Sequence, residues 1–238
     1  CVMFTFATND AHATLNGANP LLWVLGAVAA VIATVIMHVF VTKGWTAFTF
    51  PFVVTCWVLC WAFAKYNVLG LEQTTPALPD YTGTVDAITT PFYGWAEVNF
   101  GASFLTGVFI FLGLAISSPS VAMWGTAAAT LGGLFAHYVL GIDANVLANG
   151  LYSFSPILVA CAFVTKSGVS RADFVYIVVG VLLAVLIHYG VGSIVINGKN
   201  MATYTIGFIV ATWIMEAVQK AVNKSNPNTE ELVKSLNP

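Results

Sequence analysis

Long apolar stretches are the feature that most constrains what this chain can fold into. Residues 21–42 contain no charged side chain apart from the titratable His38. A helix needs roughly 17–25 apolar residues to cross a bilayer. Further apolar stretches follow at residues 46–64, 102–116, 121–140, 144–165, 174–196 and 201–218. They do not alternate as barrel strands do, so the sequence predicts membrane helices.

The composition also indicates an all-α integral membrane protein. Hydrophobic residues make up 58% of the chain and charged residues only 8%, whereas a soluble domain carries about 25% charged residues. The net charge of −2 does not bear on nucleic-acid binding, but no basic stripe is present and we expect no nucleic-acid partner. Cys56 and Cys60 lie four residues apart in an apolar run, where they are interpreted as packing residues rather than metal ligands.

The positions of the basic residues predict an orientation. If each long apolar run crosses the membrane once, and residues 91–100 dip in and return, most of the lysines and arginines share one side. That side holds Lys43, Lys166, Arg171, Lys220, Lys224 and Lys234, and the opposite side holds Lys65 and Lys199. The positive-inside rule then places the C-terminus in the cytoplasm.

Two stretches of the chain resemble each other. TAFTFPFVVTCWVL at residues 46–59 aligns with ATYTIGFIVATWIM at residues 202–215. The alignment pairs Thr49 with Thr205, Phe52 with Phe208, Val54 with Val210 and Trp57 with Trp213. On the segment count above, the two copies run in opposite directions through the membrane. Inverted repeats are typical of transporters, whose substrate site lies at the midplane where discontinuous helices meet.

The repeat predicts a division of the chain. Extending the alignment backwards, with a small gap, sets Cys1 opposite Cys161, so we expect the first part of the first repeat to be missing. The predicted architecture is an inverted-repeat bundle with re-entrant half-helices and an incomplete first repeat. Its parts are the end of the first repeat (residues 1–65), an external loop (66–90), a complete second repeat (91–218) and a cytoplasmic tail (219–238).

An interruption is expected within the stretch NGLYSFSPILVACAF, residues 149–163. The segment from Gly150 to Pro156 does not suit an uninterrupted membrane helix. Broken backbone at membrane depth is tolerated only where it lines a cavity or is buried in protein. We therefore interpret Ser153, Phe154 and Ser155 as pore-lining residues, with a plain kinked helix as the alternative.

These stretches resemble the urea transporter family, of the bacterial type. The interrupted stretch is similar to the family's re-entrant motif G-L-x-G-[FY]-N-x-x-L-V, with Phe154 and Leu158 at the matching positions. KGWTAFTFPF and KNMATYTIGF resemble its two L-P-x-x-T-x-P-F signatures, which places Thr49 and Thr205 at the shared threonine. The chain departs from the family pattern at Ser153, Ser155 and Gly207, and it lacks the leucine–proline pair before both threonines.

A further resemblance concerns the family's pore half-helix. TPFYGWAEVNFGASFLTG is similar to that element, with Glu97 at the Gln or Glu position, Phe100 three residues later and Val98 between them. FLTGVFIFLGLAISSPSVAMWG matches the T-G…L-x-S-P run that follows. The four motifs occur in the family's order along the chain.

The resemblance implies a function and a set of site residues. It implies facilitated diffusion of urea through a channel, with no enzymatic activity and no cofactor, in a homotrimer whose protomers each hold a pore. The expected location is a cell membrane, such as a bacterial inner membrane. Glu97 would accept hydrogen bonds from urea, Phe100 and Phe154 would stack on its faces, and Thr49 and Thr205 would line the constriction beside Val98 and Leu158.

Other interpretations stay open from the residues alone. Glu97 could instead be solvated at the membrane interface, each threonine could bond to its own i−4 carbonyl, and any phenylalanine could face lipid. A channel of the same fold could carry another small amide or ammonia. A different class of protein, a haem-binding redox subunit, would use His137 and His188, since His38, His137 and His188 all fall in apolar segments.

Overall fold

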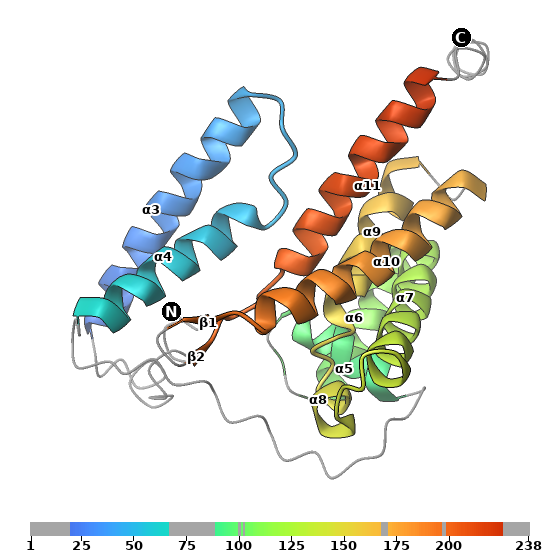
Figure 1. Ribbon diagram of the computed structural model, residues 1–238, viewed down its shortest axis with the longest axis horizontal. Coiled ribbons are helices and arrows are strands. Elements are labelled where there is room, and N and C mark those ends of the chain that lie inside the picture. The colour runs from blue at the N-terminus through green and yellow to red at the C-terminus, as the bar shows by residue number, and fades with distance from the viewer. Residues whose placement is uncertain are drawn as a thin grey trace. The chain divides into compact units, whose positions relative to one another are not determined.

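The computed structural model describes residues 20–66, 89–99, 101, 103–167, 171–196 and 199–225 (Figure 1). The chain divides into two compact units, Cys1–Leu78 and Pro79–Pro238. The predicted all-α fold is confirmed. Apart from helices, the described residues form one antiparallel hairpin of two-residue strands, β1 (Val195–Ile196) and β2 (Lys199–Asn200).

The first unit contains a pair of packed helices. They are α3 (Pro20–Thr42) and α4 (Phe50–Tyr66). The chain leaves α3 through Gly44, whose φ of +67° lies in the left-handed region that glycine adopts without steric penalty. The Phe40 ring packs against the rings of Trp45 and Phe50, with centroids 5.7 and 5.3 Å away. Phe40 therefore anchors the turn between the two helices.

The second unit is a bundle of longer and shorter helices. These are α5 (Thr89–Glu97), α6 (Phe104–Ser117), α7 (Pro119–Tyr138), α8 (Ala144–Ala148), α9 (Phe154–Ser167), α10 (Arg171–Gly192) and α11 (Ile206–Ser225). Helix α9 packs against α7, α10 and α11, and α5 packs against α6, α7 and α9. Trp95, Ala129 and Ile157 from α5, α7 and α9 form part of the buried core.

Glycines allow the helices of the second unit to approach closely. A Cβ at Gly107 of α6 would overlap the carbonyl oxygen of Phe92 on α5. One at Gly125 of α7 would lie 2.5 Å from the Trp95 ring, and one at Gly132 would overlap the Pro156 ring. Side chains at these positions would push α5 and α9 away from their neighbours.

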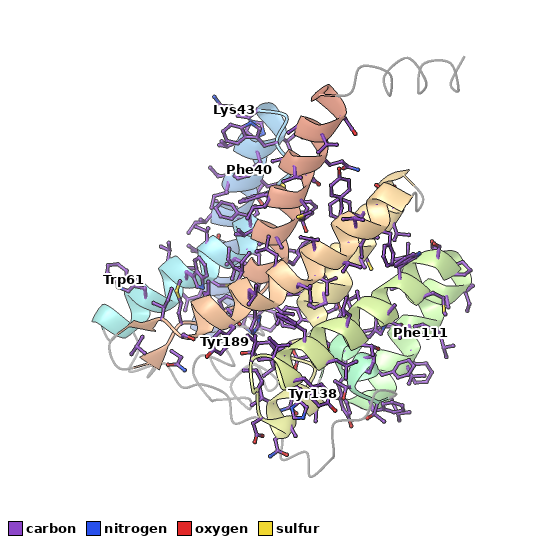
Figure 2. All side chains as sticks on the ribbon, turned by 45° about the vertical axis from the view of Figure 1, so that its right-hand side comes forward. Phe40, Lys43, Trp61, Phe111, Tyr138 and Tyr189 are labelled. Atoms are coloured by element: carbon purple, nitrogen blue, oxygen red, sulfur yellow. The ribbon has the colours of Figure 1, made fainter. Side chains whose placement is uncertain are left out.

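The outer surface of the described helices is strongly apolar. Ile116 of α6 is 86% exposed and Phe109 is 69% exposed. In the first unit, Trp61 projects from α4 and is 45% exposed (Figure 2). Within the described part of the chain, two helical stretches are long and apolar enough to cross a membrane, Trp23–Thr42 and Asp173–Gly192. Exposed apolar patches of this extent are unusual on soluble monomers and mark a membrane or protein contact.

Most limits of the predicted elements differ from the observed ones by a few residues, and three of these differences concern the region around the interrupted helix and the end of the chain. The stretch 144–165 is interrupted between Ala148 and Phe154, and its second helix, α9, begins two residues before Pro156 rather than after it. Pro156 therefore lies in the first turn of α9, where a helix requires no backbone N–H. Residues 201–205 precede α11 rather than belonging to it. Helix α11 continues to Ser225, through good helix formers such as Ala, Gln and Lys. The expected external loop and the rest of the tail lie mostly outside the described residues.

The two stretches that align in sequence also share an unusual backbone conformation. Phe48 has a φ of 48° and the aligned Tyr204 has a φ of 41°. They are the only non-glycine residues with positive φ in the described part of the chain. A left-handed aromatic residue costs roughly 1–3 kcal/mol and persists only where the surrounding structure enforces it.

The hydrogen bonds around these residues match as well. The Phe50 N–H donates to the Ala47 carbonyl at 3.0 Å, and the Ile206 N–H donates to the Thr203 carbonyl at 3.1 Å. The carbonyls of Thr49 and Thr205 each accept a bond 3.1 Å long from the residue four positions later. Helices α4 and α11 begin at aligned residues. The two stretches thus have one local structure, whereas their inverted arrangement stays a prediction.

The glycine contacts of α6 give a test of this packing. Gly107→Ala should lower the stability by about 1–3 kcal/mol, because its Cβ would meet the backbone of α5 rather than a movable side chain. Gly113→Ala in the same helix is the matched control, because its Cβ would meet nothing within 4 Å; it should be neutral or slightly stabilising. Thermal unfolding of the detergent-purified protein measures both. Equal effects of the two substitutions would contradict the backbone contact.

Candidate functional site

The interruption between α8 and α9 is a tight turn around Gly150. Asp143 caps α8 by accepting a hydrogen bond from the Asn145 N–H at 2.8 Å. Gly150 has a φ of +78°, and its carbonyl accepts hydrogen bonds from the N–H groups of Ser153 and Phe154 at 2.9 and 3.2 Å. A left-handed glycine followed by these bonds reverses the chain, and α9 starts from the turn.

Helix α5 meets this turn backbone to backbone. A Cβ at Gly150 would overlap the peptide that joins Tyr93 to Gly94. A Cβ at Gly94 would lie 2.6 Å from that of Ser153. Neither residue can carry a side chain without separating the two segments. The contact therefore fixes the end of α5 against the start of α9.

Trp95 holds the other side of α5. Its side chain is 2% exposed, and its Nε1–H donates a hydrogen bond to Thr126 Oγ1 of α7 at 3.1 Å. The Thr126 hydroxyl in turn donates to the Ala122 carbonyl at 2.9 Å. The polar edge of the indole is thus satisfied while its rings fill the core.

Glu97 is the last residue of α5 and lies one helical turn beyond the contact at Gly94. Its side chain is partly buried. Val98 follows it and is also partly buried, where it packs against the core cluster that includes Trp95. The Gly101 N–H donates to the Ala96 carbonyl at 2.9 Å and closes the end of the helix. Phe100 lies outside the described residues.

Phe154 begins α9 and is 7% exposed. Its ring lies edge-on to the imidazole of His188 on α10, with centroids 5.7 Å apart. Tyr152 contacts the same imidazole, with centroids 4.8 Å apart. Leu158 lies one turn after Phe154 and is half-buried. The aromatic residue predicted from the sequence is therefore held between the turn and α10.

Thr205 belongs to the turn before α11, and α10 links this turn to the aromatic contacts. His188 Nε2 lies 3.2 Å from the Thr203 hydroxyl, two residues before Thr205. At the start of α11, a Cβ at Gly207 would lie 2.5 Å from the Ala184 carbonyl oxygen. Thr205 is partly exposed. Thr49, its counterpart, is exposed on the turn before α4 in the first unit.

Several buried polar groups of the second unit were not singled out from the sequence. The side-chain oxygens of Thr90, Asn149 and Thr212 are buried and have no hydrogen-bond partner among the described residues. The same holds for Ser153 and Ser155, which the sequence did indicate. Isolated hydroxyls and amides in apolar stretches carry no periodic signal, so only their burial identifies them. Asn149, Ser153 and Ser155 lie in or directly beside the turn and give it a polar character.

Two further carboxylates of the second unit are buried. Asp173 in the first turn of α10 is 5% exposed, and Glu216 of α11 is 8% exposed. Asp173 Oδ1 accepts a hydrogen bond from Gln219 Nε2 at 3.0 Å. A carboxylate at a helix N-terminus is also stabilised by the helix dipole.

The two histidines of the redox alternative both have partners in the protein. His137 Nδ1 lies 3.0 Å from the Ile142 carbonyl oxygen, and His188 pairs with Thr203. Among the described residues, no group of three or more His, Cys, Asp or Glu side chains is placed to hold a metal ion.

The chain was compared with known proteins. A family model described as Urea transporter matches residues 2–220 of the 238. The search of curated proteins gave no match. Because the family model covers nearly the whole sequence, the chain belongs to the urea transporter family, whose members are membrane channels and not enzymes.

Proposed function

From its membership of the urea transporter family, we propose that this protein is a passive channel. Urea moves through it down its concentration gradient, without coupled ions, ATP or covalent chemistry. The observation that supports this best is the contact between α5 and the interrupted helix at Gly94 and Gly150. It brings the ends of two short helices, and with them Glu97 and Phe154, into one region of the second unit.

Helix lengths support a re-entrant arrangement. Helix α5 has 9 residues and α9 has 14, whereas about 20 are needed to cross the hydrocarbon core. Half-helices that meet in the membrane expose backbone and polar side chains, and these are tolerated where they line a path for the solute. The buried oxygens of Ser153 and Ser155 lie at this junction. We propose that the path for urea passes beside it.

Each predicted site residue has a role in this proposal. The Glu97 carboxylate accepts hydrogen bonds from the urea amide. The rings of Phe154 and Phe100 form a flat slot that excludes hydrated ions, and Val98 and Leu158 provide apolar walls. The hydroxyls of Thr205 and, in the first repeat, Thr49 replace lost water at the constriction, where unpaired polar groups are costly. Binding must stay weak enough for release.

We further propose how the chain is divided, how it assembles and where it is located. Residues 1–65 form the end of the first inverted repeat, 66–90 an external loop, 91–218 the second repeat and 219–238 a cytoplasmic tail. The protein forms a homotrimer with one pore in each protomer, and its apolar outer surface faces the lipid of a cell membrane, such as a bacterial inner membrane. The larger number of lysines and arginines on one side supports a cytoplasmic C-terminus.

Urea flux into proteoliposomes tests the site. Glu97→Ala and Thr205→Val should each reduce the flux about tenfold, because each removes a partner worth roughly 1–1.5 kcal/mol to the desolvated solute. Thr130→Val is the matched control for Thr205→Val, since the Thr130 hydroxyl bonds to the carbonyl of Thr126 in its own helix. Unchanged flux in both site variants would contradict the assignment. Formamide and ammonia, measured in the same vesicles, test the choice of solute.

A further inference from the structure

We propose that His188 is a positioning residue that sets the selectivity of the pore by joining the Phe154 ring to the turn that carries Thr205. The inference rests on the proposed function, because it assigns those two residues to the path of urea. His188 itself is not one of the residues proposed to contact urea.

His188 contacts both parts of the site. Its side chain is 6% exposed on α10. The imidazole contacts the rings of Tyr152 and Phe154, with centroids 4.8 and 5.7 Å away. Its Nε2 atom lies 3.2 Å from the Thr203 hydroxyl. A single side chain thus connects the turn after α8 with the turn before α11.

The hydrogen bond to Thr203 acts on a strained turn. Tyr204 has a φ of 41°, a conformation that a non-glycine residue keeps only under external constraint. The Thr203 carbonyl already accepts a bond from the Ile206 N–H at 3.1 Å. The contact with His188 fixes the same residue through its side chain. Thr203 is therefore held through both its carbonyl and its side chain, directly before the strained Tyr204 and two residues before Thr205.

The first repeat does not contain this arrangement. Phe48 is left-handed there, as Tyr204 is here, but Ala47 stands at the position of Thr203 and has no hydroxyl. A hydroxyl bond from this position is thus possible only in the second copy. Because His188 also contacts Phe154, the bond to Thr203 connects two parts of the site in the second repeat.

The surroundings of the ring favour one tautomer. His188 Nδ1 is buried without a hydrogen-bond partner among the described residues. A buried N–H donor without an acceptor is costly, so the proton belongs on Nε2, which then donates to the Thr203 hydroxyl oxygen. In this tautomer the imidazole is neutral and its orientation is fixed by one directed bond. The orientation of the imidazole relative to the Phe154 ring is fixed by the same bond.

Loss of this bond should widen the slot. A released imidazole can rotate about its side-chain bonds, and the Phe154 ring that rests on it gains the same freedom. A slot that fits planar urea would then accept a bulkier amide with less penalty. The expected signature is a change in discrimination between two solutes, which a general loss of folded protein would not produce.

The test compares urea with N-methylurea in proteoliposomes made from the full chain. His188→Leu and Thr203→Val should each raise the ratio of N-methylurea flux to urea flux about threefold or more, and the double variant should raise it no further than either alone. His188→Gln places an amide donor near the position of Nε2 and should restore the ratio, as should Thr203→Ser, which keeps the hydroxyl. His38→Leu, at an exposed histidine of α3, is the control and should leave the ratio unchanged.

The outcomes separate this inference from the proposed function. If the unchanged protein conducts no urea, the proposed function is wrong and the inference falls with it. If urea flux is normal but the ratio is the same in Thr203→Val and His188→Leu as in the unchanged protein, only the inference is wrong. Should His188→Leu fail to fold, Thr203→Val decides alone, because it replaces one hydroxyl by a methyl group of similar size.

Discussion

The approach of the Gly150 turn to the backbone of α5 is the contact on which the rest of the second unit depends. Two segments without side chains at the point of contact, Gly94 and Gly150, leave no room for either to shift. Trp95 then fixes α5 to α7 through its hydrogen bond with Thr126, and Phe154 leads α9 away from the same point. The backbone positions of Glu97 and Phe154 follow from this arrangement, and the contact with His188 then holds the Phe154 ring.

The sequence predicted much of this fold because the signals are local. Apolar length indicated helices, and Gly150 with its polar neighbours indicated the interruption. The alignment of Thr49 with Thr205 found two stretches that share even the left-handed residue before the threonine. What the sequence could not show was which polar groups become buried. Thr90 and Glu216 look like ordinary interruptions of apolar runs, and only packing against other helices removes them from solvent.

The limits of the helices show how tertiary context overrides local signals. Pro156 indicates a break, yet it lies within the first turn of α9, where its missing N–H has no intrahelical role. The apolar residues 201–205 indicate helix, yet the strained Tyr204 delays the start of α11. The sites of Phe154 and Glu97 were predicted from resemblance. The proposed role of His188 depends on contacts between residues far apart in the sequence, and a single sequence carries no signal for such contacts.

The glycines of α6 and α7 have a consequence for how such a protein could be controlled. Helices that touch through Gly107, Gly125 and Gly132 meet backbone, indole and proline rings, and none of these can swing aside as a flexible side chain can. Helix contacts of this kind resist rearrangement. If the proposed path for urea lies beside them, its width stays constant, and a cell would regulate the transport of solute by changing the number of copies in the membrane rather than by opening and closing each one.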